Sequence, residues 1–123
     1  MSALRARVPA HVTLCISGDA AAVGGLAAGC DGGYSVIGGL FPRVALQITR
    51  AALGGGTGTA QALSRKLAPP WALYDRFGGI RVMASAAAPL RLCNDDCLPR
   101  PLLGLRGDQQ ALVAAVLERL ALR

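Results

Sequence analysis

Four cysteines are the residues of this chain whose spacing is easiest to compare with known chemistry. Cys93 and Cys97 enclose the segment CNDDC, whereas Cys15 and Cys30 lie far apart, in segments that read as a strand and a loop. Four cysteines can form two disulfides or a metal site, but structural zinc sites use two closely spaced pairs. We therefore expect free thiols in a reducing cytoplasm and no metal site. A redox or zinc role for Cys93 and Cys97 is the alternative, which metal analysis would test.

Polar side chains next to glycines form a second candidate site. Gly18 and Asp19 directly follow the apolar segment VTLCIS, and Tyr34 and Ser35 lie in the run GCDGGYSVIGGLFP. Glycine allows a chain to turn tightly or to pass close to a ligand, because it has no Cβ. The same glycines also suit ordinary strand-to-helix turns and close packing, so both interpretations stay open for each of them.

Lys66 is the one lysine of the chain, and its amine is a potential nucleophile toward a carbonyl group. It lies between Arg65 and Leu67 in a segment with helical spacing, with no strand end nearby. We therefore expect Lys66 to be a solvated lysine on a helix surface.

The elements that position these residues read as a strand, a helix and a second strand. The apolar run VTLCI at 12–16 is typical of a strand buried on both faces of a parallel sheet. Residues 20–28 predict a short helix capped by Ser17 or Asp19 and ended by Gly29, and GYSVI at 33–37 predicts the second strand. Two such strands should be parallel, with a right-handed crossover. Since two strands alone leave both sheet edges unpaired, neighbouring strands must come from elsewhere.

The remainder of the chain predicts helices. Pro42 suits the first turn of a helix over about 41–53, which the glycines at 54–56 end. A helix over about 59–68 should break at Pro69–Pro70 before WALYDRF resumes it, and another should span about 80–88. After a loop at 89–106, Asp108 is expected to cap a last helix. Its apolar stripe comprises Leu112, Val113, Val116, Leu117 and Leu120.

Composition excludes several classes of protein. The chain has 123 residues, of which 53% are hydrophobic and 16% charged, so it fits a folded domain and not a disordered one. Its net charge of +6 comes from scattered basic residues, and only 4% of residues are aromatic, so we expect no nucleic-acid surface. No apolar run reaches the ~20 residues of a membrane span. The segment after Arg5 and Arg7 resembles a secretory signal, but its apolar core is short, which favours a buried strand.

The segment LCISGDAAAVGGLAAGCDGGYSVIGGLFP resembles the seventh and eighth strands of the dihydrodipicolinate synthase and N-acetylneuraminate lyase family. Typical members carry S-G-D-D, a small helix, G-x-x-G-x-x-S-V and then N-x-x-P. The similarity continues through residues 43–53, the glycines at 54–56, IRVM at 80–83 and LPRPLLGL at 98–105, so it covers about residues 4–122. It implies an α/β fold in which residues 1–53 form the last two strands of a (β/α)8 TIM barrel. Residues 54–123 would then form a helical C-terminal extension.

The resemblance also implies a site and a chemistry. Members are class I aldolase-type lyases, in which a lysine on the sixth strand forms a Schiff base with pyruvate or another 2-oxo acid, helped by a tyrosine from an earlier strand. Residues 1–11 leave room only for the end of the helix before the seventh strand, so we assign no catalytic residue, metal or cofactor. Substrate-pocket residues are expected at the strand ends. They are Gly18, Asp19, Tyr34 and Ser35.

Three positions depart from the pattern of that family. Ala20 replaces the second acidic residue after Gly18, which weakens any assignment to a sugar acid. Met83 replaces the usual lysine of the helical segment, and Tyr34 falls where members have a hydrophobic residue. The sequence therefore supports a pocket-lining role and does not support catalysis.

Two functions from different classes follow. The first is a truncated or split lyase, inactive alone, that binds a 2-oxo acid such as pyruvate once the rest of a barrel completes it, as a homo-oligomer or with a partner chain. The alternative is a noncatalytic association module, in which the helical half pairs with itself or with a complete barrel subunit. The mass of the chain in solution, alone and with a full-length relative, would distinguish the two.

Overall fold

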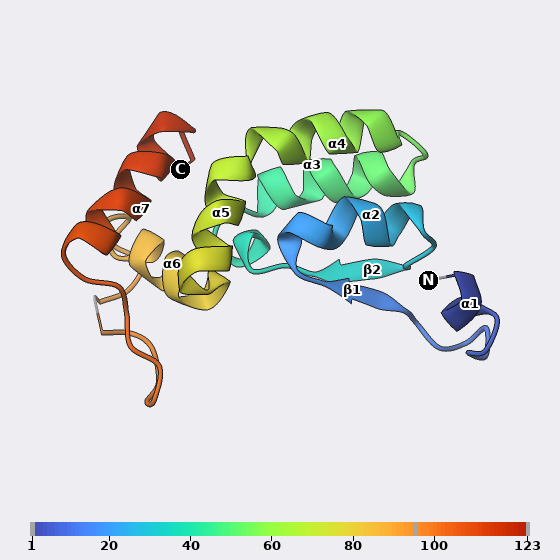
Figure 1. Cartoon of the computed structure of the whole chain (residues 1–123), viewed down its shortest axis with the longest axis horizontal. Helices are drawn as coiled ribbons and strands as arrows, with labels where there is room; N and C mark the ends of the chain where they lie inside the picture. The colour runs from blue at the N-terminus through green and yellow to red at the C-terminus, as the bar shows by residue number, and fades with distance from the viewer. Residues whose placement is uncertain (1, 95, 123) are drawn as a thin grey trace. The chain divides into compact units, whose positions relative to one another are not determined.

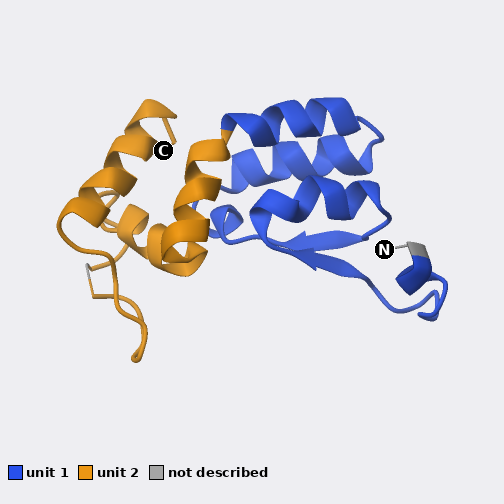
Figure 2. Ribbon diagram, in the orientation of Figure 1, with its two compact units in different colours: residues 1–66 blue, residues 67–123 orange. Residues whose placement is uncertain are grey.

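A computed structural model describes residues 2–94 and 96–122 of the chain. They form two compact units, residues 1–66 and residues 67–123 (Figure 2). The sequence analysis placed a boundary after residue 53, where a barrel part would end and a helical extension would begin. That boundary is a different one from the division between the compact units, and it stays a prediction.

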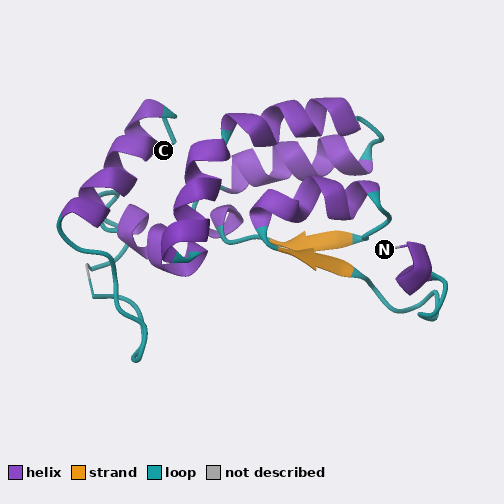
Figure 3. Ribbon diagram, in the orientation of Figure 1, coloured by secondary structure: helices purple, strands orange, loops and turns teal. Residues whose placement is uncertain are grey.

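Unit 1 contains a two-stranded parallel sheet and the helices that cover it (Figures 1 and 3). Strands β1 (Cys15–Ser17) and β2 (Gly32–Tyr34) pair in the register Cys15 to Gly32, Ile16 to Gly33 and Ser17 to Tyr34. The parallel pairing confirms the prediction. The remaining elements are, in chain order, α1 (Ser2–Arg5), the 3-10 turn η1 (Asp19–Ala21), α2 (Ala22–Ala27), the 3-10 turn η2 (Ile37–Gly39), α3 (Pro42–Leu53) and α4 (Thr57–Lys66).

Helix α2 lies directly on the sheet, because Gly25 has no side chain. A Cβ at Gly25 would stand 2.5 Å from the Cβ of Ile16, closer than packed atoms can approach. Helix α3 packs on α2 and α4, and it buries Ile48 and Ala52. Its start at Pro42, with Phe41 before the first turn, is as predicted.

The prediction that β1 is buried on both faces was wrong. Cys15 and Ser17 are exposed and Ile16 is half-buried, because helices cover one face of the sheet and no other layer is present among the described residues. The sheet is therefore open on the face opposite α2.

Neither Ser17 nor Asp19 caps the helix after β1, so that prediction was also wrong. The chain enters α2 through η1, and no side chain caps either element. Asp19 instead points its carboxylate at residues that follow β2. The predicted helix end at Gly29 is confirmed, since α2 ends at Ala27 and Gly29 has a φ of +96°.

Unit 2 is a helical unit of α5 (Ala68–Phe77), α6 (Gly79–Ala87) and α7 (Asp108–Arg119) (Figure 1). Pro69 and Pro70 lie in the first turn of α5, where a missing backbone N–H breaks no helical hydrogen bond. The helical structure is thus interrupted before this proline pair, between the end of α4 at Lys66 and the start of α5 at Ala68. The core of this unit comprises Leu67, Pro70, Trp71, Leu73, Phe77, Val82, Met83, Ala86, Leu105, Val113, Val116 and Leu117.

Two details of the last helix differ from prediction. Gly107 occupies the N-cap position. Asp108 is the first residue of the helix, and its side chain makes no capping hydrogen bond. The buried stripe is also narrower than expected, because Val113, Val116 and Leu117 are buried whereas Leu112 is 39% exposed. Among residues 2–94 and 96–122, no helix has the length and apolar character needed to cross a membrane.

Candidate functional site

The structure brings the four expected pocket residues together at the carboxyl ends of β1 and β2. Gly18 and Asp19 directly follow β1, while Tyr34 is the last residue of β2 and Ser35 comes next. The register pairs Ser17 with Tyr34, so the two strand ends lie side by side. The role of the four residues as a substrate pocket stays a prediction.

A hydrogen-bonded cluster around Asp19 joins the two strand ends. Oδ1 of Asp19 accepts a hydrogen bond from the hydroxyl of Ser35, and Oδ2 accepts two, from the backbone N–H groups of Val36 (3.0 Å) and Ile37 (3.1 Å). The Ser35 hydroxyl in turn accepts a hydrogen bond from the backbone N–H of Gly38 (2.8 Å). Asp19 is only 8% exposed, and these donors supply the hydrogen bonds that water cannot supply to a buried carboxyl group. This arrangement favours a positioning role for Asp19 and Ser35.

The same cluster explains why β2 is shorter than predicted. The carboxylate of Asp19 binds the N–H groups of Val36 and Ile37, which a longer strand would present to a neighbour. The chain then turns into η2 after Tyr34. The predicted strand over 33–37 therefore ends at Tyr34.

Position 18 requires glycine because of its backbone conformation, and not because a side chain would lack room there. Its φ is +95°, a region that residues with a Cβ rarely adopt, and a Cβ built there would meet nothing within 4 Å. Of the two interpretations left open for this glycine, the tight turn after the strand is the one that the described residues support.

Side-chain alternation places Tyr34 on the open face of the sheet. A Cβ on Gly32 would lie 3.6 Å from Sγ of Cys15, whereas a Cβ on Gly33 would face Cγ2 of Ile16 and hence the side covered by α2. Side chains alternate along a strand, so Tyr34 shares the open face with Cys15. Tyr34 is 73% exposed there.

Ser17 and Cys15 are residues of this face that the sequence analysis did not select. Both are exposed in β1, and Ser17 pairs in register with Tyr34. The signal that could have identified them is their two-residue spacing. It was hidden because VTLCI read as a continuous apolar strand without polar alternation.

A small cavity lies behind the strand ends, between β2 and the helices. Its volume is about 30 Å³, and its lining includes Asp19, Tyr34, Ser35 and Ile48. That volume suits one or two water molecules and not an organic acid. This cavity is therefore not a pocket for such a ligand.

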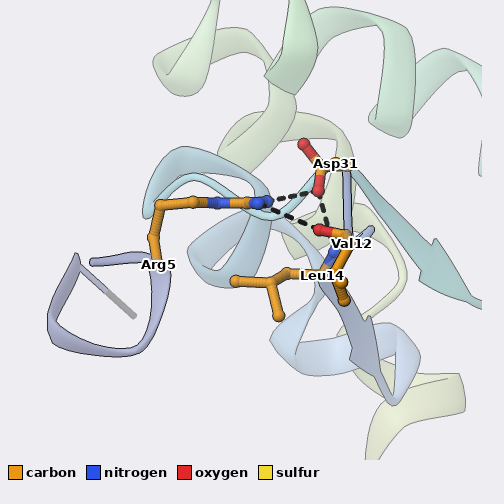
Figure 4. A network of polar contacts seen from close by, with 4 residues as sticks. All are labelled: Arg5, Val12, Leu14 and Asp31. Atoms are coloured by element: carbon orange, nitrogen blue, oxygen red, sulfur yellow. Dashed lines mark hydrogen bonds and ion pairs between the residues drawn. The ribbon is translucent and has the colours of Figure 1, made fainter. Parts of the chain in front are cut away.

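A second polar cluster, not selected from sequence, lies where the chain enters the two strands (Figure 4). Oδ2 of Asp31 accepts hydrogen bonds from the backbone N–H of Leu14 (2.8 Å) and from the guanidinium of Arg5, which also donates to the carbonyl of Val12 (3.1 Å). The Leu14 N–H, and after it Arg5, lower the pKa of Asp31 below its usual value. The one charge in the glycine-rich run therefore anchors the N-terminal segment to the sheet.

The remaining candidates for chemistry are Lys66 and the four cysteines. Lys66 is the last residue of α4 and is exposed, as expected. Among the described residues, Cys15, Cys30, Cys93 and Cys97 form no disulfide. Within the described part of the chain, no group of three or more His, Cys, Asp or Glu side chains is placed to hold a metal ion.

Comparison with known proteins gives matches to solved structures only, since no family model and no curated protein matches the chain. A dihydrodipicolinate synthase from Agrobacterium tumefaciens matches 97% of this chain with a TM-score of 0.89 and 38% sequence identity. The Aquifex aeolicus dihydrodipicolinate synthase matches 98% with a TM-score of 0.89 and 21% identity. The 4-hydroxy-tetrahydrodipicolinate synthase of Methylacidiphilum fumariolicum matches 98% with a TM-score of 0.85 and 25% identity. The chain spans about 40% of the length of each of these structures.

Proposed function

The chain corresponds to a C-terminal part of the dihydrodipicolinate synthase fold, and from this premise we propose that it forms one wall of a pocket for a 2-oxo acid such as pyruvate. In this proposal, β1 and β2 are two adjacent strands of a (β/α)8 barrel. Residues 54–123 are its helical extension. The site lies at the carboxyl ends of the strands, where barrels of this kind place their active sites.

The observation that carries the proposal is the open, polar strand-end surface formed by Ser17 and Tyr34. Both side chains belong to the face of the sheet that no helix covers, and the hydrogen bonds of Asp19 hold the two strand ends together behind them. A phenol and a hydroxyl can donate hydrogen bonds to the carboxylate of a 2-oxo acid. A pocket for a carboxylate needs hydrogen-bond donors that are held in position before the ligand arrives.

The amine that forms the Schiff base would come from outside these residues. Schiff-base formation joins a lysine nitrogen to the carbonyl carbon and releases water, so the lysine must reach the substrate at the strand ends. Lys66 is exposed at the end of α4, a helix that contributes no residue to the strand ends. We therefore assign this chain a binding role without a catalytic residue.

Borohydride trapping with pyruvate tests this assignment, because reduction converts a Schiff base into a stable adduct that mass spectrometry detects. The chain alone should give no adduct. Mixed with the N-terminal part of the Agrobacterium tumefaciens synthase that this chain does not match, it should give an adduct on that part. An adduct at Lys66 that disappears in Lys66→Arg would contradict the proposal.

Association through unit 2 is the second candidate function, and the exposure of apolar side chains on that unit favours it. Ile80, Leu92 and Leu103 are 55%, 65% and 52% exposed, far above the exposure of core residues. Such residues often mark association surfaces when they are contiguous. Measurement of mass in solution should show an oligomer, and a monodisperse monomer at high concentration would contradict this function.

We propose a reducing cytoplasm as the location of the chain, and cysteines that form no disulfide in its described part are compatible with that proposal. A thiol titration of protein purified without reductant checks the assignment. Four reactive thiols per denatured chain are expected, and two or none would indicate disulfides and contradict it.

A further inference from the structure

A groove between α2 and α4 is separate from the strand ends. It has a volume of about 300 Å³, whereas the cavity behind the strand ends has about 30 Å³, and the two share no lining residue. Pockets for small molecules occupy roughly 300–1,000 Å³, so this groove has room for a small ligand. Its lining residues are Ala20, Val23, Gly24, Gln61, Ser64 and Arg65.

The two walls of this groove differ in chemistry. Gln61, Ser64 and Arg65 form the polar wall, and their spacing of three and four residues places them on one side of α4. The wall on α2 is apolar and includes Val23 and Gly24. A Cβ on Gly24 would meet nothing within 4 Å, so space is open on that side. The groove therefore suits a ligand with a polar end and an apolar body.

Arg65 is the charged group of the groove, and one of its hydrogen bonds orients it. Its Nε donates to the backbone carbonyl of Gln61 at 3.4 Å, which holds the side chain along α4. Among the described residues, no carboxylate forms an ion pair with Arg65. The terminal N–H groups of a guanidinium can bind both oxygens of a carboxylate at once.

The charge balance of unit 1 favours an anion in this groove. Residues 1–66 contain five arginines and one lysine but only two acidic residues, Asp19 and Asp31. Asp19 accepts hydrogen bonds from residues after β2, and Asp31 binds Leu14 and Arg5. Neither acid lines the groove. A single lining cation matches a single negative charge, which favours a carboxylate over a doubly charged phosphate.

We propose that this groove binds a small organic monocarboxylate. Its carboxylate contacts the guanidinium of Arg65, and its carbon skeleton lies against Val23 and Gly24. Gln61 lines the polar wall as well, and its amide can supply a further N–H donor. The inference does not depend on the proposed function, because the groove uses no strand-end pocket residue and belongs to unit 1 alone.

Titration of the full 123-residue chain with benzoate, followed by nuclear magnetic resonance of the backbone amides, tests this site. Arg65→Gln removes the charge from the groove, while Lys66→Gln removes the same charge from the next residue, which does not line it. Gly24→Leu fills the groove from the opposite wall. All three replace exposed residues, so circular dichroism should show that the variants stay folded. Benzamide, a neutral molecule of the same shape, and inorganic phosphate are the comparison ligands.

Benzoate should shift the amide resonances of residues 20–24 and 61–65 in a saturable manner. We expect Arg65→Gln and Gly24→Leu to weaken benzoate binding at least fivefold, and Lys66→Gln to leave it within twofold of the wild-type chain. Benzamide should bind at least fivefold more weakly than benzoate. The absence of saturable binding, equal losses in Arg65→Gln and Lys66→Gln, or shifts confined to other residues would overturn the inference. Tighter binding of phosphate than of benzoate would overturn the choice of a monocarboxylate.

Discussion

Oδ2 of Asp19 lies 3.0 Å from the backbone nitrogen of Val36, and this hydrogen bond joins the turn after β1 to the turn after β2. The two residues are seventeen positions apart in the chain. The carboxylate therefore acts as a cross-connection that holds two adjacent strand ends in one arrangement, and it does so from a nearly buried position.

Replacement of Asp19 should lower stability, because its three donors would lose a charged acceptor. We expect Asp19→Asn to reduce the free energy of unfolding by about 1–3 kcal/mol, the cost of disturbing buried hydrogen bonds to a charged group. Urea denaturation followed by circular dichroism measures this. Asp75→Asn, on an exposed residue of α5, is the control and should change stability by less than about 0.5 kcal/mol. Equal effects of the two variants would contradict the role given to Asp19.

Gly18 should resist substitution for a conformational reason. Gly18→Ala should cost about 1–3 kcal/mol of stability, because alanine is strained at a φ of +95°. Gly39 offers a matched control, since a Cβ there also meets nothing within 4 Å and its φ lies outside the left-handed region. Gly39→Ala should therefore be nearly neutral in the same thermal or urea melts. A neutral Gly18→Ala would show that the turn after β1 relaxes without cost.

The neighbouring glycines of α2 should respond to alanine in opposite directions. Gly25→Ala should destabilise unit 1 by about 1–3 kcal/mol, since its Cβ would overlap the side chain of Ile16. Gly24→Ala should stabilise it by about 0.5–1 kcal/mol, because Gly24 is exposed, has no atom near its missing Cβ, and lies in a helix. Chemical denaturation of the two variants separates the effect of close packing on stability from the effect of helix propensity. The same sign of change in both variants would contradict the close approach of α2 to β1.

Asp31 should make stability depend on pH in the acid range. The pKa of Asp31 is lowered in the folded chain, first by the N–H of Leu14 and then by Arg5. Its contribution is therefore fully present above the unfolded pKa of about 3.9, and it is lost as the pH falls through the lower folded pKa. Asp31→Asn should be less stable at pH 7 and should lose less stability on acidification. Denaturation midpoints measured from pH 7 to pH 2 test this, and parallel curves for the two proteins would exclude the linkage.

Much of the local structure followed from short-range signals in the sequence. The parallel strand-helix-strand order, the start of α3 at Pro42 and the end of α2 before Gly29 were predicted and are confirmed. These features depend on backbone preferences of single residues and on apolar spacing within a few positions. The resemblance to dihydrodipicolinate synthases also came from sequence, and the similarity to their solved structures bears it out.

The partners of the polar side chains were decided by tertiary structure alone. Asp19 and Asp108 were expected to cap helices, but Asp19 binds Val36 and Ile37, and Asp108 makes no capping bond. Arg5 meets Asp31 across twenty-six residues, a pairing that no local pattern indicates.

The sequence by itself therefore determined which segments become helices and strands and which family they resemble. Tertiary structure decided which face of β1 stays open, and so which of its side chains are exposed. The reason is that propensity acts within a few residues of the chain, whereas exposure of Cys15 and Ser17 depends on which layers pack against the sheet.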